Sequence, residues 1–104
     1  MITAYKAMAD TVTKGMIADS GLHDYKIDLI TIDYTASKLV IMLKDLNGGD
    51  AELVVCPFSE LNITHNEPWG KGSYIVSSEL TSEDGRETML LELNSGDSIT
   101  VKYA

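Results

Sequence analysis

The last third of the chain alternates apolar and polar residues with a period of two, and this pattern limits the fold more than any other feature. One face of two successive runs is entirely apolar and carries Met89, Leu91, Leu93, Ile99, Val101 and Tyr103. Successive side chains of a strand point to opposite faces, so such runs are typical of strands with one buried face. Residues 94–97 between them read NSGD, which predicts a β-hairpin turn with a positive φ angle at Gly96.

Similar patterns continue upstream and predict a sheet of six or seven strands. The earlier strand-like runs occupy residues 25–34, 38–44, 53–56, 61–63 and 74–80. In the first run the apolar face changes parity at Leu29 and Ile30, which predicts a β-bulge that keeps all its apolar residues on one side. The run 38–44 is apolar on both faces, as expected of a central strand. In the last run, Tyr74, Val76 and Leu80 are expected on one face.

The N-terminal residues follow a different period and predict a helix. On a helical wheel, an arc of about 120° contains Ile2, Tyr5, Met8, Ala9, Val12 and Met16. Residues 19–21 read DSG and supply a stop signal. We therefore predict one α+β domain over residues 1–104, with an N-terminal helix packed on a mainly antiparallel sheet. The sheet is expected to curl into a partly open barrel or to form a two-layer sandwich.

The charge balance restricts the kind of partner. Sixteen Asp and Glu residues oppose eight Lys and Arg residues, giving a net charge of −8. This sign argues against nucleic acid and against an anionic membrane surface, both of which attract basic patches. It is compatible with a basic protein partner, or with a role in solubility alone. One cysteine and the lack of a signal-peptide pattern or a long apolar stretch lead us to expect a cytoplasmic protein.

No motif predicts catalysis or cofactor binding. His23 with Asp24 and His65 with Glu67 lack the spacing of a zinc site, so no metal is expected. Cys56 lies at the end of an apolar run, where packing is the expected role. Residues 70–73 read GKGS but lack the upstream glycine of a phosphate-binding loop and precede a strand. We therefore expect a protein that is not an enzyme, with no catalytic residues, metal ligands or cofactors.

Trp69 is the candidate for a role beyond folding. It is the single tryptophan and lies between Pro68 and Gly70 in a loop, and tryptophan is enriched at binding hot spots. The alternative is that Trp69 covers the open end of the sheet. The candidate interaction surface consists of the tryptophan and nearby or turn-borne acids: Trp69, Glu67, Glu83 and Asp84.

Two stretches carry a family resemblance. Residues 68–75 read PWGKGSYI and residues 91–101 read LELNSGDSITV. They resemble small uncharacterised bacterial domains with a Trp-Gly-x-Ser element and an acidic Leu-x-Ser-Gly-Asp-x-Ile hairpin near the C-terminus, some of which are thought to be immunity proteins of toxin systems. This chain departs from the pattern by one extra residue in the GKGS segment.

The resemblance implies a non-enzymatic immunity or inhibitor protein that caps a basic partner such as a toxin nuclease. The alternative function is a structural module that assembles as a homodimer. These two functions predict different partners: a basic protein in the first case and a second copy of the chain in the second.

Overall fold

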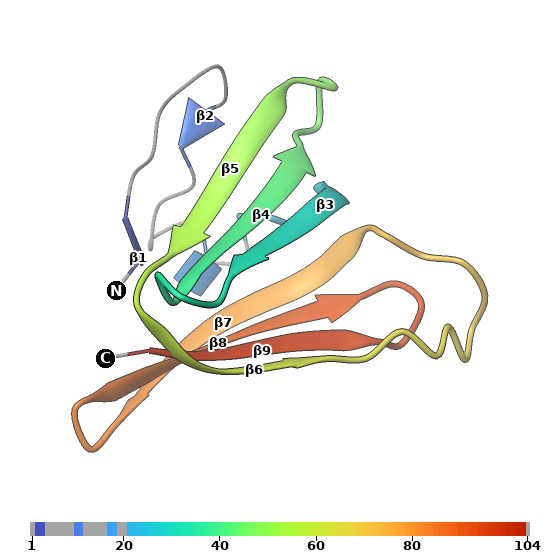
Figure 1. The fold of residues 1–104 in the computed structure, drawn as a ribbon. Helices are drawn as coiled ribbons and strands as arrows, with labels where there is room; N and C mark the ends of the chain where they lie inside the picture. The colour runs from blue at the N-terminus through green and yellow to red at the C-terminus, as the bar shows by residue number, and fades with distance from the viewer. Residues whose placement is uncertain (1, 4–9, 12–16, 19–20, 104) are drawn as a thin grey trace.

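A computed structural model describes residues 2–3, 10–11, 17–18 and 21–103, and these form two β-sheets that face each other (Figure 1). The first sheet contains β1 (Ile2–Thr3), β2 (Asp10–Thr11), β3 (Lys26–Asp33), β4 (Lys38–Lys44) and β5 (Asp50–Val55). The second contains β6 (Phe58–Ile63), β7 (Ile75–Glu83), β8 (Arg86–Leu93) and β9 (Ser98–Tyr103). The strand order is β1-β5-β4-β3 in the first sheet, with β2 also on β5, and β6-β9-β8-β7 in the second.

Where the structure describes the segment predicted as a helix, at residues 2–3 and 10–11, the chain is extended, so the predicted α+β class with an N-terminal helix is wrong. Ile2 and Thr3 pair antiparallel with Val55 and Val54, and β2 pairs parallel with the other end of β5. β-branched residues favour strands, and pairing with an available sheet edge overrides a helical period in the sequence. The other residues of the expected helix, 4–9 and 12–16, lie outside the described residues.

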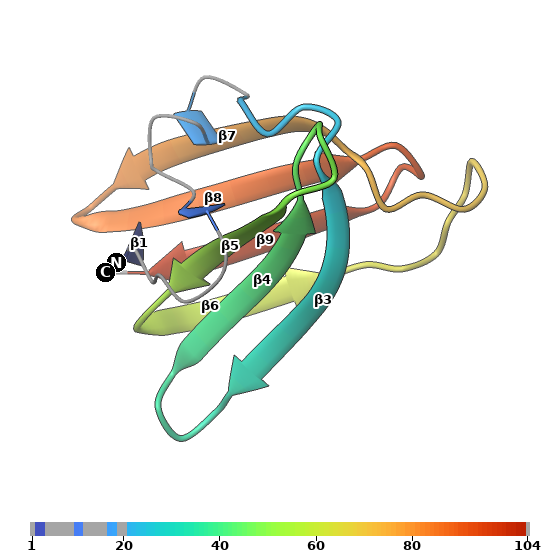
Figure 2. The ribbon, with the colours of Figure 1, turned by 90° about the horizontal axis from the view of Figure 1, so that it is seen from above.

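All the other strand pairs are antiparallel, which confirms the expected antiparallel β structure. The strands of the first sheet cross those of the second steeply (Figure 2). The chain passes between the sheets at Pro57, which follows a cis peptide bond and ends β5 as the sequence predicts. There the Phe58 amide donates to the Ser37 carbonyl. At another corner, Lys26 and Tyr74 form an isolated antiparallel bridge between the two layers.

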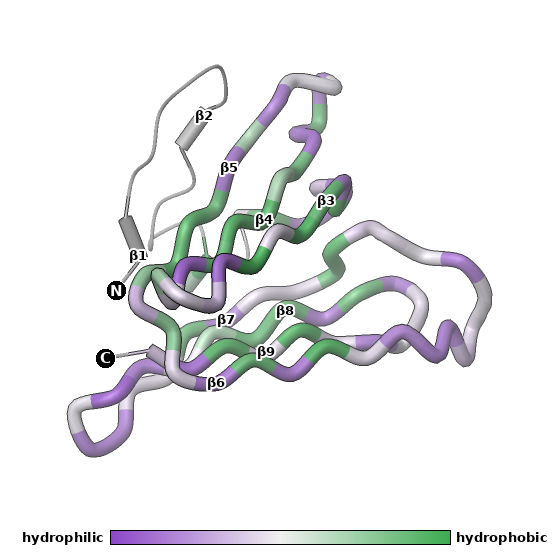
Figure 3. The backbone as a smooth tube through the Cα atoms, viewed as in Figure 1, coloured by the Kyte–Doolittle hydropathy of each residue, from purple (hydrophilic) through white to green (hydrophobic). Residues whose placement is uncertain are grey.

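The core lies between the layers and is built from their inward faces. Figure 3 shows the apolar stretches along β4, β5, β8 and β9 that supply it. Leu39, Ile41 and Leu53 of the first sheet face the apolar side of the C-terminal hairpin, and all are fully buried. Ile17 and Leu22 are also fully buried, and Ser78 Oγ donates to the Ile17 carbonyl over 2.7 Å.

Register shifts in β3, β6 and β7 change which residues point inward, and those in β3 and β7 alter the predicted faces. In β3 the register shifts between Ile27 and Leu29, one position earlier than predicted, so Leu29 pairs with Met42 on the outer face and is 59% exposed. In β7 the shift lies between Ile75 and Ser77. There Ile75 is buried while Tyr74 and Val76 are exposed, which reverses the predicted assignment. A bulge puts two residues opposite one; the change of parity in the sequence indicated the bulge in β3, whereas the alternation of Tyr74, Val76 and Leu80 gave no sign of the one in β7.

Candidate functional site

The outer face of the four-stranded sheet carries one apolar island in an otherwise polar surface. Cross-strand pairs place polar residues such as Glu79, Thr100 and Asn62 on this face. Trp69, Val76 and Leu90 interrupt it and surround a hollow of about 280 Å³. The hollow is lined by Trp69, Val76, Leu90, Glu92, Leu93, Gly96, Asp97 and Ser98.

The hollow exists because the residues flanking Glu92 are small. Glu92 of β8 pairs with Ser77 of β7 on one side and with Ser98 of β9 on the other. Neither serine fills the space above the sheet, so the hollow opens between Trp69 and the outer face of β8. Glu92 is itself exposed, and its carboxylate is therefore available to a binding partner.

Asp97 fixes the loop that carries Trp69. Its carboxylate accepts hydrogen bonds from the Thr64 hydroxyl (3.0 Å), the amides of Asn66 and Glu67 (2.8 Å each) and the Ser95 hydroxyl (2.9 Å). Asp97 is 3% exposed. Burial alone would raise the pKa of this carboxyl, but the hydrogen bonds from Asn66, Glu67, Ser95 and Thr64 outweigh it and lower the pKa to about 2. The ionised carboxylate therefore ties residues 64–67 to the β8–β9 turn.

The β8–β9 turn packs directly against the indole of Trp69. The Trp69 amide donates to the Ser95 carbonyl over 3.1 Å. Gly96 has a φ of 92°, which confirms the predicted positive angle, and a methyl group on it would lie 3.0 Å from Trp69 Cε3 and 2.9 Å from Pro68 Cγ. The indole thus rests against Gly96, yet Trp69 is 80% exposed. This exposure excludes the alternative that Trp69 covers the core.

The two sequence elements behind the family resemblance meet in this site. Beyond the contacts of Trp69, the Tyr74 amide donates to Asn94 Oδ1 over 3.2 Å, and the Asn94 amide donates to the Tyr74 carbonyl over 2.9 Å. A side chain at Gly72 would collide with Asn94 Oδ1. The loop and the β8–β9 turn therefore form one closely fitted unit, called here the loop-turn unit (residues 64–74 and 94–97).

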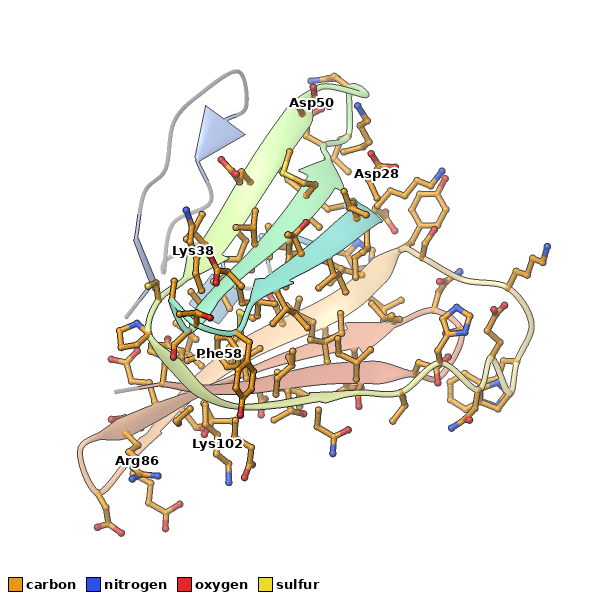
Figure 4. The ribbon with its side chains drawn as sticks, in the orientation of Figure 1. Asp28, Lys38, Asp50, Phe58, Arg86 and Lys102 are labelled. Carbon is orange, nitrogen blue, oxygen red and sulfur yellow. The ribbon has the colours of Figure 1, made fainter. Side chains whose placement is uncertain are left out.

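The structure brings together only part of the predicted interaction surface. Glu67 lies in the loop-turn unit with Trp69, and its Oε1 is 3.3 Å from His65 Nε2. Glu83 and Asp84 lie at the β7–β8 turn, at the opposite end of β7 from the loop (Figure 1). They line a separate hollow with Arg86 and Lys102. Figure 4 labels these two basic residues on the same side of the second sheet as the β7–β8 turn, and Lys102 Nζ lies 3.3 Å from Glu60 Oε2.

The other candidate groups form pairs and no larger cluster. His23 Nδ1 lies 3.2 Å from Asp24 Oδ2, with both side chains more than half exposed. In the part of the chain that the structure describes, no three His, Cys, Asp or Glu side chains gather at one point. Cys56 is partly buried, with its Sγ 3.7 Å from the Ala36 carbonyl. Among the same residues, no helix is long and apolar enough to cross a membrane.

A third hollow, of about 180 Å³, lies between the sheets. Apolar residues from both layers dominate its lining, including Ile27, Ile30, Ile63, Leu93 and Ile99. Among the described residues, its lining contains no Asp, Glu, Lys or Arg side chain and no tryptophan. The hollow beside Trp69 is therefore the stronger candidate for recognition.

Reasoning from sequence missed Leu90, Glu92 and Asp97 as parts of this site. The acidic residue of the NSGD turn resembles any turn aspartate until the loop folds onto it. Glu92 resembles any outward-facing strand residue, because its hollow depends on serines brought beside it from β7 and β9. Trp69 and the NSGD turn both belong to the resemblance, but no contact between them was predicted from it.

Comparison of the chain with protein-family models, with curated proteins and with solved structures finds no match. The function is therefore argued from the geometry of the loop-turn unit and the hollow beside it.

Proposed function

We propose that this protein is a non-enzymatic protein-binding domain whose contact surface is centred on Trp69. The observation that carries the proposal is an indole that is 80% exposed and yet seated on a turn fixed by a buried carboxylate. Exposing a large aromatic side chain to water is unfavourable, and tryptophan is enriched at binding hot spots. A fixed contact group loses little conformational entropy on binding, which favours affinity.

The charge supports a basic partner. The net charge is −8, and the described residues that line the hollow include Glu92 and Asp97 but no lysine, arginine or histidine. An acidic surface speeds association with a basic protein and disfavours acidic competitors. An immunity or inhibitor protein that covers a basic toxin would be one form of this function, and it is the form that we propose.

Site-directed photocrosslinking in the native host tests the proposal. A photoreactive amino acid replaces Trp69 in one variant and Tyr34 in a control; Tyr34 is 89% exposed and follows β3 of the other sheet. We expect one stoichiometric, basic protein to crosslink through position 69 and not through position 34. Crosslinking at position 69 only to a second copy of this chain, or to the same proteins as at position 34, would contradict the proposal.

The edge of the first sheet favours a second candidate function, assembly as a homodimer. β3 is the last strand of its sheet, and Leu29, Ile32 and Tyr34 on or beside it are 59%, 47% and 89% exposed. An exposed apolar edge strand can pair with the same strand of another copy. Light scattering tests this assembly. A molar mass near twice 11.3 kDa for the natural sequence and a monomeric mass for Ile32→Lys would support a dimer. A monomeric mass of the natural sequence at high concentration would exclude it.

A further inference from the structure

We infer that the hollow beside Trp69 binds an arginine side chain of the partner protein. This inference rests on the proposed protein-binding function and names the chemical group that the site recognises. It follows from three features of the hollow: the available indole surface, an unpaired carboxylate and apolar walls.

Trp69 offers a surface for a planar cation. One part of the ring rests against Gly96, and the rest is open to the hollow and to solvent. Cations are attracted to the faces of aromatic rings, most strongly to tryptophan. The hydrogen bonds of the loop-turn unit fix the backbone that carries the ring before any ligand arrives.

Glu92 supplies the negative charge that a cation would pair with. Within the described part of the chain, its carboxylate takes part in none of the ion pairs, which involve other acids. Asp97 also lines the hollow, but its oxygens are already occupied by the hydrogen bonds that fix the loop. The charge of Glu92 is therefore the one available for pairing with a bound group.

Arginine fits this combination better than lysine. Its guanidinium group is planar, stacks on aromatic rings and donates two parallel hydrogen bonds to a carboxylate. The apolar side chains of Val76 and Leu90 border the same hollow and can cover the methylene stem. A lysine ammonium is a more strongly hydrated point charge and gains less from stacking.

Binding of small probes to the intact protein tests the inference. The probes are N-acetyl-arginine methylamide, its citrulline analogue, which has nearly the same shape without the charge, and the lysine analogue. Because Trp69 is the single tryptophan, its indole Nε1–H signal in a nitrogen-proton NMR spectrum reports on the site without ambiguity. We expect a saturable shift with the arginine probe, a much weaker response to the lysine probe and none to the citrulline probe.

A pair of variants tests the role of Glu92. Glu92→Gln is expected to raise the dissociation constant of the arginine probe about twofold to fivefold, the range for an exposed charge pair. Glu79→Gln is the matched control, because Glu79 lies on the same outer face of the sheet but outside the hollow. The control should leave the dissociation constant unchanged.

Several results would overturn the inference. They are an unchanged indole signal up to the solubility limit of the arginine probe, equal binding of the citrulline or lysine probe, or equal effects of the Glu92 and Glu79 substitutions. If one of these results is obtained but a partner still crosslinks through position 69, only the arginine assignment is refuted and the proposed protein-binding function stands. If no partner crosslinks through position 69, the proposed protein-binding function itself is refuted.

Discussion

Replacing Gly96 with alanine is the sharpest test of how the loop-turn unit is built. Gly96 has a φ of 92°, and an added methyl group would lie 2.9 Å from Pro68 Cγ and 3.0 Å from Trp69 Cε3. Alanine therefore meets two separate penalties at this position. The first is the unfavourable backbone conformation, and the second is the displacement of the indole from its seat.

The magnitudes of the two penalties can be separated. A left-handed backbone costs a non-glycine residue about 1–2 kcal/mol, and the lower entropy of the unfolded alanine chain offsets about 0.4–1 kcal/mol of this. Forcing an extra methyl group into a filled space costs a further ~1–3 kcal/mol. We therefore expect Gly96→Ala to lower the free energy of unfolding by about 1–5 kcal/mol.

Gly85→Ala is the matched control. Gly85 has a φ of 77° in the β7–β8 turn, but an added methyl group would meet nothing within 4 Å. It should therefore lower the free energy of unfolding by only about 1 kcal/mol. Urea denaturation followed by far-ultraviolet circular dichroism measures both values, and the emission of Trp69 in the native state should shift only in Gly96→Ala. Equal destabilisation by the two variants, with unchanged emission, would refute the packing of the indole on the turn.

Three further predictions concern the Asp97 carboxylate that fixes the loop, the exposed indole and the core. The carboxyl of Asp97 has its pKa lowered from 3.8 to about 2 in the folded protein, so its stabilising effect is complete above pH 3.8 and is lost as the pH falls toward 2. Asp97→Asn should therefore destabilise the protein at pH 7 and flatten the pH dependence of the free energy of unfolding in that acidic range. An unaltered pH dependence would contradict the role of the Asp97 carboxylate in fixing the loop. Trp69→Ala should change the free energy of unfolding by less than about 1 kcal/mol because the side chain is mostly exposed, and a larger loss in thermal or urea unfolding would mean that the indole supports the core. Leu53→Ala should lower the free energy of unfolding by about 2–5 kcal/mol, because Leu53 is fully buried between the sheets. Leu46→Ala serves as its control, because Leu46 is exposed. Similar urea midpoints for the two variants would contradict the placement of the core.

The strands that the sequence predicted well are those with a strongly apolar run between clear turn residues. The runs carrying Leu91 and Val101 became β8 and β9, and residues 38–44 became β4 with the predicted bounds. In each case alternation, local turn residues and burial point to the same structure. Such agreement between local and global preferences makes a segment predictable.

The errors arose where a distant contact decided the outcome. The apolar residues from Ile2 to Met16 satisfy a helical wheel, but pairing of Ile2 and Thr11 with β5 is a tertiary interaction that no local window contains. The bulge in β7 that exposes Val76 likewise depends on its register with β8. These are places where tertiary pairing overrides local propensity.

Only the tryptophan of the candidate site could be predicted, because the rest of the site depends on contacts between residues that are distant in the sequence. Trp69 could be singled out from composition, since it is the only tryptophan and lies in a loop. The hollow beside it could not, because Glu92, Ser77 and Ser98 come from three strands and meet only in the folded sheet. Glu83 and Asp84 were included for their charge, but the length of β7 separates them from the tryptophan.

The central claim is that Trp69 is both exposed to solvent and fixed in place, and fluorescence of this single tryptophan tests it most directly. Acrylamide quenching measures access to the indole, and time-resolved anisotropy measures its motion. The account predicts efficient quenching together with an anisotropy that decays at the tumbling rate of the whole 11.3 kDa domain. An indole that is shielded from acrylamide, or one that loses its anisotropy through fast local motion, would contradict it.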